Sequence, residues 1–348
     1  MSKYLVGIIF FLIGFKVSGQ QVTRLGLEAN YGFIIPHSPD LRPISNSNPT
    51  GVAAHYQWMP TNKRAWDICN CFHYRGIQAS YHSFGNPDVL GSAITISGTF
   101  EPILWEKARW RLSLLSGFGI SYLTNVFDEQ TNPDNLFLSS SLSFLIFASP
   151  KIEYVIHPDW SVHFSFAYNH ISNGGQQQPN KGINYPMLGF GVNKYFNRPV
   201  LPDYEAEVLE RNWKGYLELG VTTREAAWTE GRKPTISFAG GTKRSVSRIN
   251  ALGGGIEVTK DFALEIENSR IEAIMPAPFI AHHFELGRFD FSQRFAMYTY
   301  KPADYIDHRF YQRYVLLYNF IDELKLGFSL KVHGHVAENI DLRASWNF

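Results

Sequence analysis

The stretch WRLSLLSGFGISY, residues 110–122, carries the alternation that decides the fold. Its large apolar side chains share one face: Trp110, Leu112, Leu114, Phe118, Ile120 and Tyr122. The other face holds smaller or polar side chains: Arg111, Ser113, Gly117, Gly119 and Ser121. Successive side chains of a β-strand point to opposite faces, so the stretch predicts a strand with one apolar and one polar or small face.

The same two-residue period recurs along the chain, at residues 25–33, 136–146 and 339–348. A strand that is apolar on one face and polar on the other is typical of a transmembrane barrel, whose outside meets lipid and whose inside does not. A soluble β-sandwich also alternates, so composition has to separate the two classes.

Composition favours the barrel. Aromatic residues make up 15% of the chain and charged residues 18%, against about 25% charged in typical soluble domains. Lys3 and the apolar run at residues 4–15 predict a secretory signal peptide over residues 1–19, and no later run is long enough for an apolar membrane helix. The net charge of +1 gives no basic footprint for nucleic acid.

The end of the chain, NIDLRASWNF at residues 339–348, is an amphipathic strand that finishes in phenylalanine. It resembles the closing strand of bacterial outer-membrane barrels. That resemblance implies that Phe348 acts as a signal to the barrel-assembly machinery, and that the protein resides in the outer membrane of a Gram-negative bacterium.

The alternating segments predict an all-β fold, a transmembrane antiparallel β-barrel of about 16 strands in two halves of about 8. The halves are residues 20–196 and 213–348, and residues 197–212 form a linker on the periplasmic side. One wide barrel and two small tandem barrels fit the pattern equally well.

The stretch YNHISNGG, residues 168–175, ends one strand with an unusual feature. His170 and Ser172 continue the lipid-facing row, where polar side chains need a reason. The same alternation (the parity of a position in its strand) predicts that Asn184, on the following strand, also points outward. Side chains at i and i+2 of a strand are roughly 6.5 to 7 Å apart, which suits a general base beside a hydroxyl nucleophile.

The segment HISNGGQQQPNKGIN, residues 170–184, is similar to the active-site segment of the lipid A 3-O-deacylase (PagL-like) family of outer-membrane barrels. The resemblance implies that His170 is the base and Ser172 the nucleophile, and that Asn173 and Asn180 help to bind the oxyanion. It implies hydrolysis of an ester-linked acyl chain of lipid A, with no cofactor and no metal. The family pattern leads us to expect glutamate at position 184, where this chain has asparagine.

The second half resembles longer, two-part members described as acyloxyacyl hydrolases. There the parity turns Lys331, His333 and His335 inward with Asp341 and Arg343, which predicts a charge network in the lumen and no second active site. Two alternative functions stay open: a non-catalytic pore or scaffold, and an outer-membrane phospholipase.

Cys69 and Cys71 are the only cysteines. A disulfide between residues i and i+2 has unfavourable geometry, and two thiols without a matching histidine or acid are a poor zinc site. We therefore expect a structural or incidental role for them, with a redox role as the minor alternative. The adjacent His282 and His283 point to opposite faces of a strand, which disfavours a metal site there.

Overall fold

The computed structural model describes residues 21–173, 177, 179–197, 201–205, 211–225, 231–247, 249–264, 273–302, 308–321, 323–334 and 336–348. The predicted signal peptide, at residues 1–19, lies outside the described residues. Among the residues described, no helix is long and apolar enough to cross a membrane.

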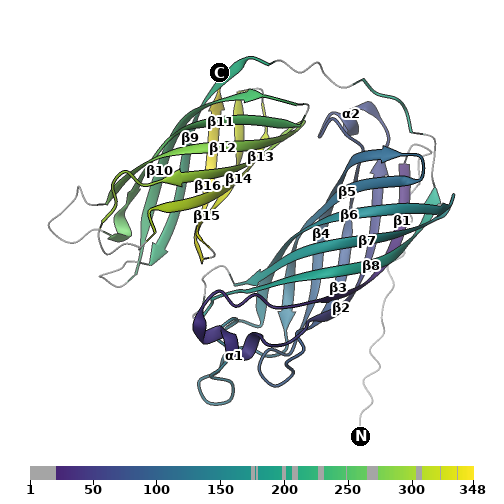
Figure 1. Ribbon diagram of the computed structural model, residues 1–348, viewed down its shortest axis with the longest axis horizontal. Coiled ribbons are helices and arrows are strands. Elements are labelled where there is room, and N and C mark those ends of the chain that lie inside the picture. The colour runs from purple at the N-terminus through teal and green to yellow at the C-terminus, as the bar shows by residue number, and fades with distance from the viewer. Residues whose placement is uncertain are drawn as a thin grey trace, which may run out of the picture.

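The strands close into two antiparallel barrels of eight strands each, which lie side by side (Figure 1). The predicted fold class is confirmed, and of the two arrangements left open the tandem one is correct. The first barrel contains β1 (Gln21–Gly32), β2 (Thr50–Pro60), β3 (His73–Ser83), β4 (Ser92–Lys107), β5 (Trp110–Leu123), β6 (Leu142–His157), β7 (Trp160–Ser172) and β8 (Ile183–Asn197).

The second barrel contains β9 (Trp213–Glu225), β10 (Arg232–Ser245), β11 (Asn250–Asp261), β12 (Ile274–Leu286), β13 (Phe289–Met297), β14 (Phe310–Asn319), β15 (Leu324–His333) and β16 (Val336–Asn347). In the part of the chain that the structure describes, four short helical segments lie between strands: η1 (Pro39–Leu41), α1 (Arg42–Ser45), α2 (Lys63–Trp66) and η2 (Phe262–Leu264). Because β1 pairs with β8 and β9 with β16, each half closes on itself.

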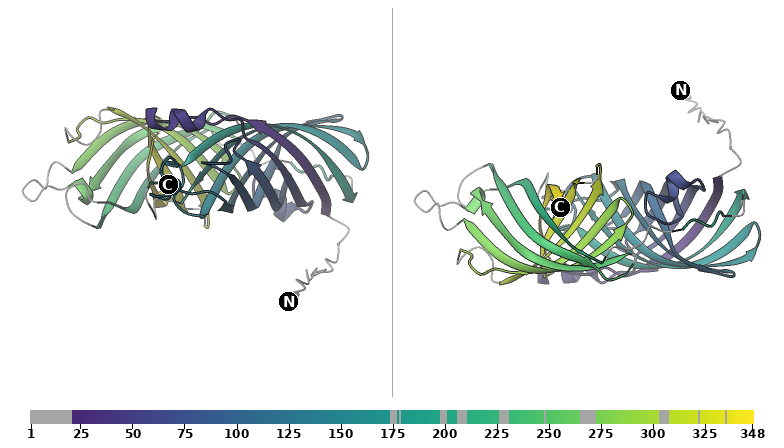
Figure 2. Two further views of the ribbon diagram at one scale, coloured as in Figure 1. Left: turned by 90° about the horizontal axis from the view of Figure 1, so that it is seen from below. Right: turned by 90° about the horizontal axis from the view of Figure 1, so that it is seen from above.

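Each barrel has two different rims. We call the rim that carries the start of its first strand and the end of its last strand the terminal rim, and the opposite one the loop rim. In the first barrel the loop rim carries the connections at residues 33–49, 84–91, 124–141 and 173–182. Figure 1 shows α1 and these loops at the opposite end of that barrel from α2, and the two views in Figure 2 show the strands of both barrels strongly tilted.

The outer surfaces are apolar, as the alternation predicts. Along β5 the outward side chains include Leu112, Phe118 and Ile120, all exposed, and the inward ones include Arg111, Ser113 and Ser121, all buried. Exposed apolar side chains around a closed barrel are suited to hydrocarbon, where backbone groups must be satisfied within the sheet.

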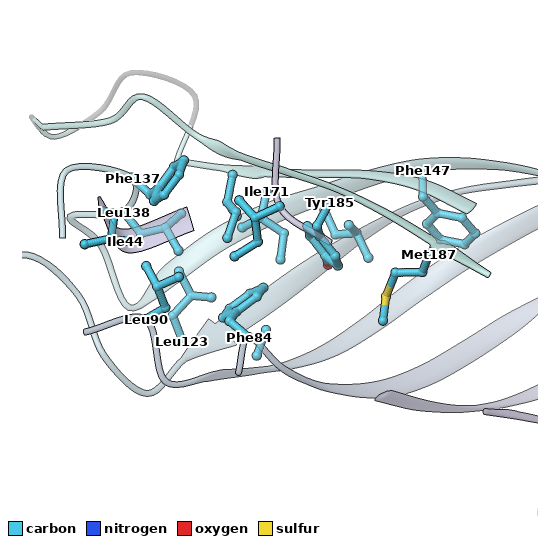
Figure 3. Packing of buried hydrophobic residues seen from close by; sticks show 14 of the residues in the cluster. Ile44, Phe84, Leu90, Leu123, Phe137, Leu138, Phe147, Ile171, Tyr185 and Met187 are labelled. Atoms are coloured by element: carbon cyan, nitrogen blue, oxygen red, sulfur yellow. The ribbon is translucent and has the colours of Figure 1, made fainter. Parts of the chain in front are cut away.

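The interior of the first barrel changes character along its axis. Toward the terminal rim it is charged, with Arg24 contacting Glu101 at 2.6 Å and Glu153 at 2.9 Å. Toward the loop rim it is an apolar plug, most of which Figure 3 shows. The plug comprises Ile34, Leu41, Ile44, Phe84, Leu90, Ala93, Leu115, Leu123, Phe137, Leu138, Leu145, Phe147, Ile171, Ile183, Tyr185 and Met187. An eight-stranded barrel is just wide enough for side chains to fill, and buried charged and apolar side chains occupy the interior of this one.

Candidate active site

The candidate site lies where β7 and β8 reach the loop rim of the first barrel. The strands pair with His170 opposite Asn184 and Ile171 opposite Ile183. Ile171 and Tyr185 point inward and are fully buried in the apolar plug (Figure 3). Because neighbouring side chains alternate, these inward anchors turn His170, Ser172 and Asn184 to the outer face.

The imidazole of His170 is held by its partner across the strand pair. Its Nδ1 lies 2.7 Å from Oδ1 of Asn184. An amide oxygen can only accept, so Nδ1 carries the proton and donates it. The other ring nitrogen, Nε2, is then left with a lone pair, which is the form that a general base requires.

Ser172 occupies the next outward position of the same strand and pairs through its backbone with Phe144 of β6. It is partly exposed, as is His170. Within the described part of the chain no hydrogen bond joins the two side chains. Catalytic hydrogen bonds are often long before substrate binds, and the strand spacing of roughly 6.5 to 7 Å lets the two groups approach through side-chain rotation.

Asn173 and Asn180, the predicted oxyanion residues, hold the β7–β8 loop in this structure. The backbone N–H of Asn173 donates to Oδ1 of Asn180 at 3.1 Å. The Asn173 side chain is buried, and its Nδ2 donates to Ser139 Oγ at 3.1 Å and to the Gln177 carbonyl oxygen at 2.8 Å. Their role toward substrate stays a prediction. Residues 174–176 lie outside the described residues.

Two contacts that the sequence did not suggest fix this loop from outside. The β5–β6 loop accepts backbone hydrogen bonds from it, from Lys181 N–H to the Leu136 carbonyl and from Gly182 N–H to the Phe137 carbonyl. The ammonium group of Lys181 also pairs with Asp40, just before α1. Hydrogen bonding by Lys181 lowers the pKa of Asp40 to about 2.

The second barrel has the lumenal charge network that parity predicts. Arg343 contacts Glu218 at 3.0 Å, Glu257 at 3.2 Å and Asp341 at 3.0 Å, all inside the barrel. Lys331 and His333 are also buried there; His335 falls outside the described residues. Arg343 thus has partners of opposite sign, which a charge inside a barrel requires.

The paired histidines separate as predicted. His283 points inward, 2.9 Å from Asp290, and His282 points outward, 2.9 Å from Asn250. The two rings therefore do not converge on a common ligand.

The two cysteines form a disulfide at the terminal rim of the first barrel. Asn70 between them adopts a positive φ of 49°, which closes the short ring. His73 Nδ1 lies 3.3 Å from Cys69 Sγ, so a histidine does lie beside the two cysteines, contrary to the expectation from the sequence. The three could present ligand atoms within 4.8 Å of one another, but the sulfurs are bonded to each other, so the group is structural in this form.

Comparison with known proteins follows the division into two barrels. Residues 50–193 match the family model "Lipid A 3-O-deacylase (PagL)", and residues 211–348 match "Acyloxyacyl hydrolase, C-terminal domain". The chain belongs to the PagL-like family of outer-membrane barrels. These matches confirm the resemblance to this family that the sequence indicated. They also confirm the predicted localisation of the protein in a Gram-negative outer membrane.

Solved structures give weaker likenesses. The outer-membrane enzyme PagL is 16% identical with a TM-score of 0.35, covering 48% of this chain and 97% of its own. Neisserial surface protein A is 9% identical with a TM-score of 0.33, covering 50% and 97%. Omp33 of Acinetobacter baumannii is 8% identical with a TM-score of 0.20, covering 95% and 100%. No curated protein matches the chain. The assignment to the PagL-like family therefore depends on the two family models.

Proposed function

We propose that this PagL-like protein is an outer-membrane serine carboxylesterase that removes an ester-linked fatty acyl chain from lipid A. The observation that carries the proposal is the 2.7 Å contact between His170 Nδ1 and Asn184 Oδ1, with Ser172 at the next outward position. A base held in the correct tautomer beside a hydroxyl, on a wall that faces lipid, suits an ester that lies in the membrane plane. The acyl chains can remain in hydrocarbon while the sugar stays near the rim.

In the proposed reaction Nε2 of His170 takes the proton of the Ser172 hydroxyl as Oγ attacks the ester carbonyl. The tetrahedral intermediate collapses, the ester C–O bond to the sugar breaks, and the imidazolium returns its proton to the leaving sugar oxygen. Water then attacks the acyl-serine with His170 again as base. The products are a free fatty acid and the regenerated serine.

Asn184 can orient the imidazole but cannot neutralise the imidazolium. A carboxylate at this position would do both, and in serine proteases the change from Asp to Asn costs roughly 10⁴ in rate, chiefly through the wrong tautomer. Here the amide oxygen already selects the correct tautomer. We therefore infer a slower enzyme than a carboxylate-containing relative, and one that is still active.

For the oxyanion we propose Asn173 and Asn180, which border Ser172 on the loop side. In the resting arrangement both donor hydrogens of the Asn173 amide are engaged, one by Ser139 of the β5–β6 loop and one by the Gln177 carbonyl of its own loop. Stabilisation of the oxyanion by this amide requires it to exchange one of these bonds for the substrate oxygen. A donor aimed in this way is worth roughly 10² to 10³ in kcat.

The pore alternative is disfavoured by the lumen of the first barrel, because the apolar plug closes the described part of that lumen at the loop rim. The phospholipase alternative uses the same chemistry on a different lipid, so only the substrate distinguishes it.

Phe348 is the proposed signal to the barrel-assembly machinery. Its side chain is exposed at the terminal rim, and its backbone pairs with Gly215 of β9, donating at 3.0 Å and accepting at 2.8 Å. The signal therefore lies on the strand pair that closes the second barrel.

The deciding experiment is incubation of the purified, folded protein with lipid A and, separately, with phospholipid vesicles, followed by mass spectrometry. Lipid A should lose the mass of one fatty acid, and Ser172→Ala should leave it intact. The proposal fails if the native protein and Ser172→Ala yield the same lipid A profile. Hydrolysis of phospholipid alone would make the protein a phospholipase.

A further inference from the structure

The second barrel contacts the first, and the contact begins at the terminal rims. The backbone N–H of Arg288, in the turn between β12 and β13, donates to the Ile68 carbonyl at 2.7 Å. The ring of Phe289 lies 5.3 Å from that of Phe100 on β4. The two barrels therefore share a seam along their outer walls.

The seam reaches the strand that carries the candidate site. Tyr168 lies on the outer face of β7, at the outward position that precedes His170. Its hydroxyl is close enough to that of Tyr314 on β14 for the two groups to interact electrostatically. Both tyrosines point away from their own lumens and keep 45% and 38% of their surface exposed. The outer face of β14 is thus opposite the outer face of β7.

The directions of β7 and β14 place a further residue of β14, Gln312, near the point where Tyr168 and Tyr314 face each other. β7 runs toward its loop rim and β14 runs away from its own. His170, two residues after Tyr168, and Gln312, two residues before Tyr314, consequently both lie on the loop-rim side of the tyrosine pair.

Gln312 is a polar residue on the otherwise apolar outer face of β14. It points outward, because Tyr311 and Arg313 on either side of it are buried in the lumen. Its neighbours in register are Phe295 and Val332, so it is an amide in an apolar row.

The amide oxygen of Gln312 is also buried without a partner. Its Oε1 has no hydrogen-bond partner among the described residues. A buried, unpaired amide oxygen is unfavourable, which indicates a hydrogen-bonding ligand that is absent from the isolated chain.

We propose that Gln312 is a substrate-binding residue which the second barrel contributes to the site of the first, and that it recognises a hydroxyl or amide group at the root of a substrate acyl chain. This inference rests on the proposed function. Tyr314 and Phe295, on the same outer wall, line the path of the chain itself.

The chemistry of the amide sets the specificity. Its oxygen accepts and its nitrogen donates, so it suits a group that also does both, and it has no partner on an unsubstituted hydrocarbon chain. A site built to hydrogen-bond a substrate group discriminates strongly against an analogue that lacks the group, because its own polar atoms are then left unpaired.

The test uses two esters of one chromogenic alcohol, tetradecanoyl and β-hydroxytetradecanoyl, presented in detergent micelles. The native protein should prefer the hydroxylated ester by roughly tenfold or more in kcat/KM. Gln312→Met, of similar length, should lose that preference mainly through a higher KM for the hydroxylated ester. The matched control is Phe238→Met on β10, across the same barrel from β14 and exposed to lipid; it should keep the preference.

Each other outcome has a definite meaning. A native protein that hydrolyses both esters equally, or a Gln312→Met variant that keeps the preference, overturns the role of Gln312 and leaves the esterase intact. A native protein inactive on both esters and on lipid A overturns the proposed function, and this inference with it. If Gln312→Met does not fold, judged by heat-dependent gel mobility, Gln312→Leu replaces it.

A cross-link tests the geometry independently of catalysis. Cysteines placed at 168 and 314 by Tyr168→Cys and Tyr314→Cys should be joined by a short bifunctional maleimide, since the native cysteines are bonded to each other and do not react. Absence of that cross-link in the folded protein would mean that β14 does not face the site, and the inference would be wrong.

Discussion

Gly182 lies directly against the imidazole of His170. A Cβ added at this glycine would come within 2.7 Å of the ring carbon Cε1 and within 3.3 Å of Nε2, and the backbone there has a φ of +68°. The turn that leads into β8 thus packs its bare backbone against the nitrogen proposed as the base, and the position of the ring depends on the absence of a side chain.

We predict that Gly182→Ala displaces the imidazole and lowers kcat roughly 10²-fold, because a misplacement of about 1 Å in a catalytic group has an effect of that size. Gly334→Ala is the matched control. It has a similar φ of +62° but nothing within 4 Å of the added Cβ, so it has the same backbone strain of about 1–2 kcal/mol without touching the site. Steady-state ester hydrolysis by both folded variants measures the difference, and equal activities would contradict the packing argument.

Position 184 separates orientation from charge. We predict that Asn184→Glu raises kcat, because a carboxylate also stabilises the imidazolium. The gain should fall well short of the roughly 10⁴ lost in serine proteases, because most of that loss comes from the wrong tautomer and Asn184 already selects the correct one. Asn184→Leu should lower kcat, since the ring then loses the partner that selects its tautomer. Single-turnover release of fatty acid measures the chemical step. An unchanged rate in Asn184→Glu would mean that another group orients His170.

The disulfide at the terminal rim supports the contact between the barrels. The ring closed by Cys69 and Cys71 follows Ile68, whose carbonyl accepts the Arg288 N–H, and Gly287 packs against the same backbone. We predict that the double change Cys69→Ser and Cys71→Ser speeds hydrogen exchange at the Arg288 amide by roughly tenfold, through local opening of the contact.

The control for that experiment is the Gly215 amide, which bonds to the Phe348 carbonyl within the second barrel. Its exchange should not change, because its hydrogen bond lies entirely within the second barrel. Equal exchange at Arg288 in the native protein and the variant would show that the contact does not need the disulfide.

The strands were predictable because a barrel in lipid imposes one rule on every position. The alternation of side chains along a strand was enough to place His170 and Ser172 outward and Lys331 and Arg343 inward. Each side chain needs only to suit the surroundings of its own face, which are lipid outside and the lumen inside. Closure was not predictable, because one wide sheet and two small ones require the same alternation, and only the pairings of β1 with β8 and β9 with β16 distinguish them.

The surroundings of the site were not predictable for a different reason. Gln312 lies 142 positions after His170 in the chain, and its relation to the site depends on how two separately closed barrels dock. The bond of Asn173 to Ser139 likewise joins two loops that sequence parity does not describe. The alternation along residues 310–319 does predict that Gln312 points outward among apolar side chains, as it does for His170 and Ser172.

The pair formed by Lys181 and Asp40 joins the β7–β8 loop to the segment that leads into α1. The pKa of Asp40 is lowered from 3.8 to about 2 by the hydrogen bond from Lys181, so the carboxylate form is the one that the folded loop favours. A carboxyl group with a depressed pKa contributes its stabilisation fully above its pKa in the unfolded chain and loses it as the pH falls through its pKa in the folded protein.

We predict that docking of residues 39–45 is constant above about pH 4 and weakens toward pH 2. Hydrogen exchange of that segment, compared between the native protein and Lys181→Met, measures it. The protection of the segment, which is its exchange rate relative to the intrinsic rate at the same pH, should be lower in the variant at neutral pH and should no longer depend on the titration of Asp40. The exposed pair of Lys63 and Asp67 lies on the opposite rim, and a Lys63→Met control should leave residues 39–45 unaffected. A segment that exchanges at the same rate in native protein and Lys181→Met would show that the apolar plug alone holds this loop in place.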